Sequence, residues 1–217
     1  MNLEEIVENV FNVIFHNRRT MGSTFLRFQE HYESPKFKGK IFTLEEFKKW
    51  YIKNSQIGKK TGRFTYYSDW CGFNIPSFIL NPFYEGKFNP LSPNEKKLLE
   101  LFEDKKEKNF YVVGTVGEKN KDTLAHEVAH GLFYTKKEYK SKTMKFLQTI
   151  RPEVRKKINK SLIQRGYCQE VLDDEAHAYI LGGFWKYISV NPKKDDLTGI
   201  RKELLNMFVR YSGINIS

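Results

Sequence analysis

The sequence predicts an α+β fold that is mostly helical, with a small central β-sheet. Apolar residues recur at helical spacing over most of the chain, while short runs rich in aromatic and β-branched residues lie near its middle. The chain has 217 residues, 40% of them hydrophobic and 29% charged, which is typical of a folded globular protein. We find no repeat, low-complexity tract or long linker. We therefore expect one domain over residues 1–217, with a helical N-terminal part (1–60) followed by the sheet and the C-terminal helices (61–217).

The N-terminal part contains three helix-like segments. Residues 3–18 carry apolar side chains at helical spacing, and residues 23–32 fit either a helix or a strand. A capping box begins the next helix, with Thr43 as N-cap and Glu46 three residues later. Residues 58–62 are basic and bounded by glycines, which indicates a loop.

The small sheet is predicted from three strand-like runs, at residues 64–67, 78–80 and 110–116. Residues 68–76 lie between the first two runs and are predicted to form a loop. Its central portion, Asp69 to Asn74, is rich in aromatic and small residues. That portion fits either a packed turn or a loop that contacts a substrate.

Helices are predicted for most of the remaining chain. Ser92 and Glu95 form a second capping box, with a proline at the first helical position, and begin a helix over residues 92–106. A lysine-rich connection follows Tyr134. Further helical segments are predicted at residues 142–150, 152–164, 167–181 and 196–211.

One segment in the second half carries a metal-binding pattern, HExxH, formed by His126, Glu127 and His130. On a helix, residues four apart project from the same face, so the two imidazoles can hold one Zn²⁺ ion. Glu127 follows the first histidine, which places its carboxylate beside a metal-bound water as a general base. The alternative is a buried amphipathic helix with two incidental histidines.

A catalytic zinc ion takes three protein ligands, so one ligand must come from elsewhere. The acidic segment that begins at Glu170 supplies the candidates, and we favour Glu175, which would complete a His₂Glu set. Asp174 and His177 remain alternatives for this ligand, and Asp174 or Asp173 could instead bind the second nitrogen of a ligand histidine. Tyr179 lies one helical turn after Glu175. It is a candidate donor to a reaction oxyanion, with a packed core tyrosine as the alternative.

The residues Thr123 to His130 resemble the active-site helix of zincin metallopeptidases. With a downstream glutamate the chain is similar to the gluzincin branch, and Glu175-Ala176 is loosely similar to the third-ligand helix of ImmA/IrrE-like peptidases. The resemblance implies a zincin-like fold around one Zn²⁺ ion. It also implies that an edge strand beside the cleft pairs with an extended substrate, and the strand just before the HExxH helix is the candidate.

The leading functional hypothesis is zinc-dependent hydrolysis of peptide bonds in a protein or peptide substrate. A second hypothesis is a catalytically silent zincin-fold module that binds a partner, with nucleic acid as one option. The formal net charge of +11 allows that option, but we find no named nucleic-acid motif and interpret the charge mainly as solubility. A third is a metal hydrolase acting on a bond other than a peptide bond.

The cysteine content and hydropathy indicate a cytoplasmic protein without a membrane span. Cys71 and Cys168 are too few for a disulfide scaffold, and they could pair only if the fold brings them together. No apolar run approaches the ~20 residues that a membrane helix needs. The first five residues are acidic where a signal peptide is basic, from which we expect a cytoplasmic location.

Overall fold

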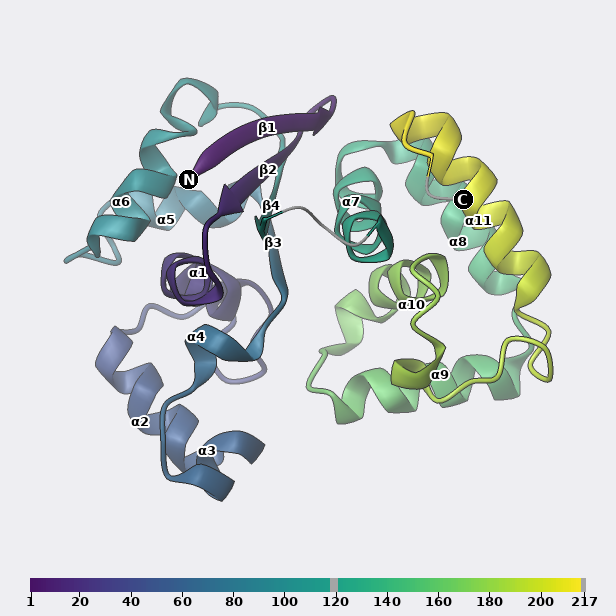
Figure 1. The fold of residues 1–217 in the computed structure, drawn as a ribbon, viewed down its shortest axis with the longest axis horizontal. Helices are drawn as coiled ribbons and strands as arrows, with labels where there is room; N and C mark the ends of the chain where they lie inside the picture. Colours follow the sequence, from purple (N-terminus) through teal and green to yellow (C-terminus); the bar gives the residue numbers. More distant parts are fainter. Residues whose placement is uncertain (118–120, 216–217) are drawn as a thin grey trace.

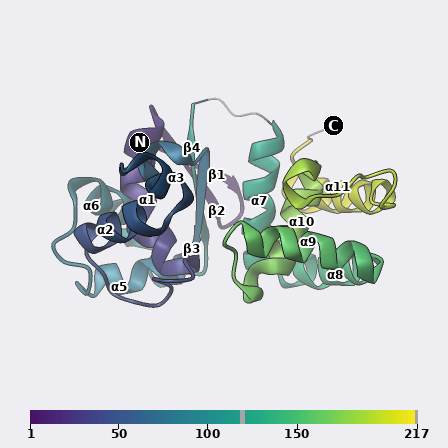
Figure 2. The ribbon, with the colours of Figure 1, turned by 90° about the horizontal axis from the view of Figure 1, so that it is seen from below.

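The computed structural model describes residues 1–117 and 121–215, apart from the side chains of 121–123. It confirms the predicted α+β class, with helices on both faces of one four-stranded sheet. Helices α1 to α6 lie on one side of the sheet and α7 to α11 on the other (Figures 1 and 2). The sheet thus stands between two helical layers.

The sheet has the strand order β1-β2-β4-β3. β1 and β2 form an antiparallel hairpin, β2 and β4 are parallel, and β4 and β3 are antiparallel. This order makes β3 an edge strand and β4 an interior strand. The strands are β1 (Asn2–Val7), β2 (Val10–Phe15), β3 (Gly72–Pro76) and β4 (Tyr111–Val116).

The prediction of a helix over residues 3–18 was wrong, because this segment forms the β1-β2 hairpin. Val7 pairs with Val10 across a two-residue turn, in which Asn9 adopts φ 64°. Asparagine is one of the few residues that accept this left-handed conformation readily. β2 is buried along nearly its whole length, so its apolar residues do not alternate and the helical spacing was accidental. The prediction of β4 at residues 110–116 was confirmed.

The helices before β4 confirm both capping boxes, those of Thr43 with Glu46 and of Ser92 with Glu95. The segment left open between helix and strand is helical. The elements are α1 (Arg18–Glu33), α2 (Leu44–Asn54), α3 (Gln56–Thr61), α4 (Tyr66–Asp69), η1 (Ser77–Leu80), α5 (Asn81–Tyr84), α6 (Pro93–Glu100) and η2 (Glu103–Lys105), where η denotes a 3₁₀ helix.

Three predictions in this region were wrong. Residues 58–62 belong mostly to α3 rather than to a loop, and residues 64–67 and 78–80 contribute to α4 and η1 rather than to strands. The strand lies instead within 68–76, where alternate residues of β3 are buried against α1. The aromatic residues that raise strand propensity on either side pack as core residues of short helices.

The helices after β4 follow the predicted segments, with one longer than expected. The lysine-rich connection after Tyr134 is largely helical, because Tyr139, Thr143 and Leu147 form a buried stripe beneath exposed lysines. The elements are α7 (Lys121–Thr135), α8 (Lys137–Gln148), α9 (Pro152–Gln164), η3 (Gln169–Val171), α10 (Leu172–Leu181), η4 (Trp185–Ile188) and α11 (Thr198–Ser212).

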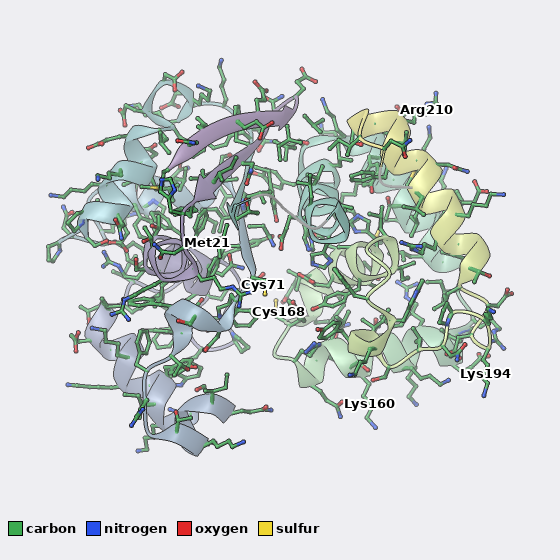
Figure 3. The ribbon with its side chains drawn as sticks, in the orientation of Figure 1. Met21, Cys71, Lys160, Cys168, Lys194 and Arg210 are labelled. Carbon is green, nitrogen blue, oxygen red and sulfur yellow. The ribbon has the colours of Figure 1, made fainter. Side chains whose placement is uncertain are left out.

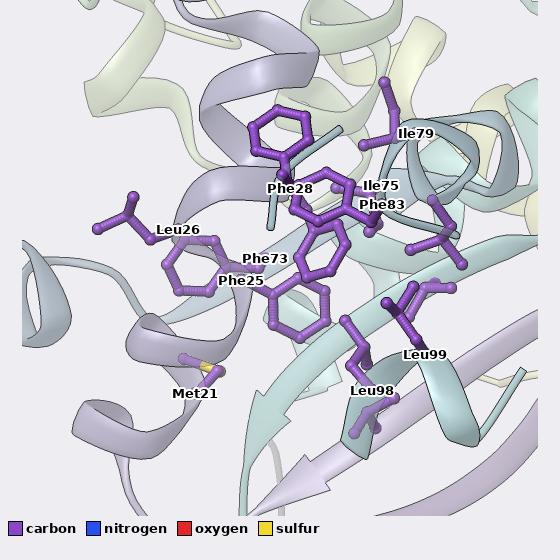
Figure 4. Close-up of a cluster of buried hydrophobic side chains, with 14 of the residues drawn as sticks. Met21, Phe25, Leu26, Phe28, Phe73, Ile75, Ile79, Phe83, Leu98 and Leu99 are labelled. Atoms are coloured by element: carbon purple, nitrogen blue, oxygen red, sulfur yellow. The ribbon is translucent and has the colours of Figure 1, made fainter. Parts of the chain in front are cut away.

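Two large hydrophobic cores flank the sheet in the described part of the chain. One packs α1 and its neighbours against the sheet through stacked aromatic rings such as Phe25 and Phe73 (Figure 4). The other packs α7 against the four helices that follow it, α8, α9, α10 and α11. α7 lies close to the sheet at Gly131, where an added Cβ would be 2.7 Å from the Val10 side chain. This close approach brings the HExxH helix directly against the sheet.

A buried ion pair stabilises the first core. The Arg27 guanidinium in α1 donates to both Glu95 carboxylate oxygens, at 2.7 and 2.6 Å, and also to the Phe88 carbonyl at 2.8 Å. Glu95 also accepts from the Ser92 backbone as part of its capping box. One carboxylate therefore caps α6 and neutralises a buried charge.

Among the described residues, no helix is both long enough and apolar enough to cross a membrane.

Candidate metal centre

Helix α7 brings the two histidines of the HExxH pattern together. The Nε2 atoms of His126 and His130 lie 3.4 Å apart. Two ligands that each lie about 2.05 Å from a tetrahedral metal ion are about 3.4 Å apart, so this spacing suits shared coordination. The opposite face of α7 is buried through Val128 and Leu132, which fixes the direction in which the imidazoles point.

Helix α10 crosses α7 and adds a carboxylate to the pair. Glu175 Oε1 lies 3.7 Å from His130 Nε2, and one ligand atom from each of His126, His130 and Glu175 lies within 4.8 Å of the others. Glu175 is 4% exposed, and its Oε2 has no hydrogen-bond partner among the described atoms. A buried carboxylate oxygen without a donor is costly, and burial raises the pKa of Glu175 well above its ordinary value. The donor set and this unpartnered oxygen both fit a bound cation.

Asp174 lies behind His130 rather than beside the other ligand atoms. Its Oδ1 is 3.0 Å from His130 Nδ1. Because this contact engages Nδ1, the Nε2 atom of His130 is the one directed at His126 and Glu175. The arrangement corresponds to the predicted role for Asp174 as the partner of a ligand histidine's second nitrogen.

The charges of this cluster are strongly coupled. Burial would lower the pKa of His130, but the Asp174 and Glu175 carboxylates outweigh it and raise that pKa to about 10. Burial and the neighbouring His130 lower the pKa of His126 to about 3. Burial would raise the pKa of Asp174, but the pairing with His130 and His177 holds it below its ordinary value. Burial and the neighbouring charges thus shift the pKa values of the two histidines in opposite directions.

His177, the other candidate for the third ligand, and Asp173, the other candidate partner for a ligand histidine, are engaged elsewhere. His177 is fully buried, its Nδ1 donates to the Asp174 carbonyl at 2.6 Å, and its ring stacks on Phe133 with 5.1 Å between centroids. Asp173 pairs with Arg155 at 2.7 Å. The structure therefore brings neither residue to the three ligand atoms.

Glu127 points from α7 toward the edge strand β3. Its Oε2 accepts from Asn74 Nδ2 at 2.8 Å, and Asn74 Oδ1 accepts from the Tyr111 hydroxyl at 2.5 Å. A Cβ at Gly72 would lie 2.7 Å from Glu127 Oε1, so the carboxylate occupies space that any other residue would fill. Sequence reasoning placed Gly72 and Asn74 in a loop and did not connect them to Glu127. The alternation of small or polar residues with apolar ones from Gly72 to Ile75 was the available signal in the sequence.

The edge of the sheet nearest this site belongs to β3. The expectation that the strand just before the HExxH helix is the edge strand was wrong, because β4 lies between β2 and β3. Ser77 donates to the Phe110 carbonyl, and the antiparallel alternation then directs the backbone groups of Gly72 and Asn74 away from β4. On that outer side the Asn74 N–H donates to Gln29 Oε1 over 3.4 Å, a long hydrogen bond.

Tyr179 lies beside the first histidine. Its ring is perpendicular to the His126 ring at 4.9 Å, and its hydroxyl is 3.2 Å from that of Tyr167. Burial raises the pKa of Tyr179, which keeps the hydroxyl protonated and able to donate. Phe184 also contacts His126, at 5.5 Å between centroids. The placement is consistent with both the packed and the oxyanion-binding roles, so the catalytic role stays a prediction.

Both cysteines are free thiols. Figure 3 shows Cys71 and Cys168 where the two helical layers face each other. Cys168 Sγ lies 3.3 Å from Lys38 Nζ, across this junction.

Comparison with family models, with curated proteins and with solved structures found no match to this chain.

Proposed function

We propose that this chain is a zinc-dependent metallopeptidase. The observation that carries the proposal is the 3.4 Å spacing of the His126 and His130 Nε2 atoms, with the Glu175 carboxylate beside them. A His₂Glu set with a neighbouring glutamate is the composition of a catalytic rather than a structural zinc site.

In the proposed mechanism His126, His130 and Glu175 hold one Zn²⁺ ion, and Asp174 fixes the orientation of His130. Zinc bound there would lower the pKa of a water molecule and polarise the carbonyl of the cleaved bond. Glu127 accepts the proton of the attacking water and passes it to the leaving amine. Tyr179, whose hydroxyl stays protonated, is the candidate donor to the oxyanion.

A peptide substrate fits the edge strand beside Glu127. Gly72 and Asn74 direct backbone groups away from β4, and backbone pairing at an exposed edge is a general way to hold extended peptides. The long bond from the Asn74 N–H to Gln29 is the contact that a substrate carbonyl would replace. This favours protein or peptide substrates over small molecules.

The test compares the purified protein with Glu127→Gln. Zinc content is measured by mass spectrometry, and cleavage is followed on a mixture of proteome-derived peptides by sequencing the new termini. We expect about one zinc per chain in both proteins and cleavage by the wild type alone. Glu203→Gln, at an exposed site on α11, is the matched control and should cleave normally. Cleavage by Glu127→Gln at the wild-type rate would refute the mechanism.

The same measurements separate the rival functions. Zinc binding with no peptide cleavage, together with salt-sensitive binding to DNA or RNA, would favour a catalytically silent binding module. Turnover of small esters or amides without peptide cleavage would favour a hydrolase for another bond.

We also propose a cytoplasmic location, supported by the two free thiols, since reducing compartments keep cysteines unpaired.

A further inference from the structure

A chain of two hydrogen bonds links the central sheet to the HExxH helix. The Tyr111 hydroxyl of β4 donates to Asn74 Oδ1 of β3 at 2.5 Å, and Asn74 Nδ2 donates to Glu127 Oε2 of α7 at 2.8 Å. Asn74 and Tyr111 are not among the three candidate metal ligands. The bonds therefore hold the group next to the metal site rather than the site itself.

The direction of each bond follows from the chemistry of its partners. An ionised carboxylate only accepts, so Asn74 must turn its NH₂ group toward Glu127 and its carbonyl oxygen toward Tyr111. Tyr111 must then donate. Burial, followed by the nearby tyrosine and carboxylate groups, raises the pKa of Tyr111 well above its ordinary value, so its proton is retained. With Glu127 ionised, these two bonds fix the orientation of the Asn74 amide.

We propose that Asn74 is a positioning residue for Glu127, and that Tyr111 acts through Asn74 by fixing the orientation of its amide. The inference rests on the proposed function of Glu127 as general base. A glutamate side chain has three rotatable bonds, and displacement of a reacting group by about 1 Å costs on the order of 100-fold in rate. Gly72 contributes to the same end, because its lack of a side chain leaves room for the other carboxylate oxygen.

The experiment uses Asn74→Ala, Tyr111→Phe and the double variant, all loaded with zinc. The matched control is Asn12→Ala. Asn12 is a buried asparagine of the same sheet, and its Oδ1 accepts from Thr115 at 2.8 Å. Measurements are kcat and KM on one peptide that the wild type cleaves, zinc content, and thermal unfolding. The NMR signals of the Asn74 side-chain amide give a readout that needs no turnover.

For Asn74→Ala we expect kcat to fall by about 10–100-fold with KM and zinc content unchanged. Tyr111→Phe should lower kcat by about fivefold, the effect of losing one hydrogen bond. If Tyr111 acts only through Asn74, the double variant will match Asn74→Ala rather than show the product of the two losses. Asn12→Ala should lose stability but keep kcat within about twofold. In the NMR spectrum, Tyr111→Phe and Glu127→Gln should each shift the Asn74 amide signals.

Several outcomes would overturn the inference. One is Asn74→Ala with the kcat of the wild type, and another is losses that multiply in the double variant. If Asn74→Ala does not fold, Tyr111→Phe decides, because it keeps the ring and removes only the hydroxyl. An inactive wild type would refute the proposed function. If, in addition, the NMR signals of the Asn74 amide do not shift in Glu127→Gln, the hydrogen bond between Asn74 and Glu127 would be refuted as well.

Discussion

Replacing Gly72 with alanine tests the position of Glu127 without touching a charged group. The new Cβ would lie 2.7 Å from Glu127 Oε1 and 3.3 Å from its Cδ, while the next neighbour, the Gly114 carbonyl oxygen, is at an ordinary 3.5 Å. Non-bonded atoms are most stable at about 3.5–4.0 Å, so the carboxylate must move by about 0.5–1 Å. A displacement of that size predicts a fall in kcat of about 10–100-fold.

Unlike kcat, the free energy of unfolding should change little in Gly72→Ala. Gly72 is not among the residues with positive φ, so alanine fits its backbone, and such a replacement stabilises by about 0.4–1 kcal/mol through the unfolded chain. The displaced carboxylate lies at the end of a flexible side chain and offsets part of this gain. We therefore expect Gly72→Ala to bind zinc fully, to unfold near the wild-type temperature, and to cleave slowly.

The assay combines kcat on a cleaved peptide, zinc content and thermal unfolding. Gly199→Ala is the control, because a Cβ there meets nothing within 4 Å and it also lacks positive φ. It should keep the wild-type kcat. A zinc-loaded Gly72→Ala with unchanged kcat would refute the argument that the Glu127 position sets the rate.

Three further predictions concern the metal, the core and pH. Asp174→Asn should weaken zinc binding about 10–100-fold in a chelator competition, while Asp173→Asn, whose partner is an arginine of α9, should not. Glu95→Ala should cost about 3–5 kcal/mol in urea unfolding, because it leaves the buried arginine of α1 without its carboxylate partner. Glu46→Ala, which removes the carboxylate of an exposed capping box, should cost about 1 kcal/mol, and equal losses would contradict this prediction. Burial raises the pKa of Glu30 from 4.5 to about 7, against hydrogen bonds that lower it. The folded state then holds a proton that the unfolded chain releases, so this group removes up to about 3 kcal/mol of stability as pH rises from 4.5 to 7. In urea unfolding, Glu30→Gln should be more stable than wild type at pH 8 and nearly equal to it at pH 4. An equal gain in stability at the two pH values would refute the raised pKa of Glu30.

Local rules account for the elements that sequence predicts well. The capping boxes at Thr43 and Ser92 depend on residues three apart, and both form as predicted. The HExxH helix likewise depends on a spacing of four. Such features are decided within one turn of chain and need no knowledge of the fold.

The elements that sequence mispredicts depend on distant partners. The sequence of β2 was interpreted as a helix because the strand is buried on both faces, so its apolar residues do not alternate. The strand is buried because β4 lies beside it and α7 and α1 pack on its two faces. β3 pairs with a strand more than thirty residues later, and its length of five residues gives little periodic signal. Burial within a sheet is a property of the assembled fold, so local spacing cannot reveal it.

The candidate third ligand lies between these cases, because its segment but not its position can be predicted from the sequence. Asp174, Glu175 and His177 share one helix, and each step along it rotates the side chain by about 100°. The composition predicts a ligand in this segment, but which residue faces His130 depends on how α10 packs across α7. The structure directs Glu175 to the Nε2 side and Asp174 to the Nδ1 side of that ring. Glu175, the candidate ligand, and Asp174, its supporting group, thus differ by a rotation of about 100° around the axis of α10.

The candidate metal ligands and the groups that hold Glu127 belong to different parts of the molecule. The three candidate ligands lie on α7 and α10, which share the second core, whereas Asn74 and Tyr111 lie on the sheet. Metal affinity should therefore depend on the packing of α10 against α7, and the orientation of Glu127 on the contact between α7 and the sheet. A change at the second contact can misplace Glu127 while zinc stays bound, so zinc content alone does not report on a working site. For this reason each test of the sheet residues must measure zinc content and kcat separately.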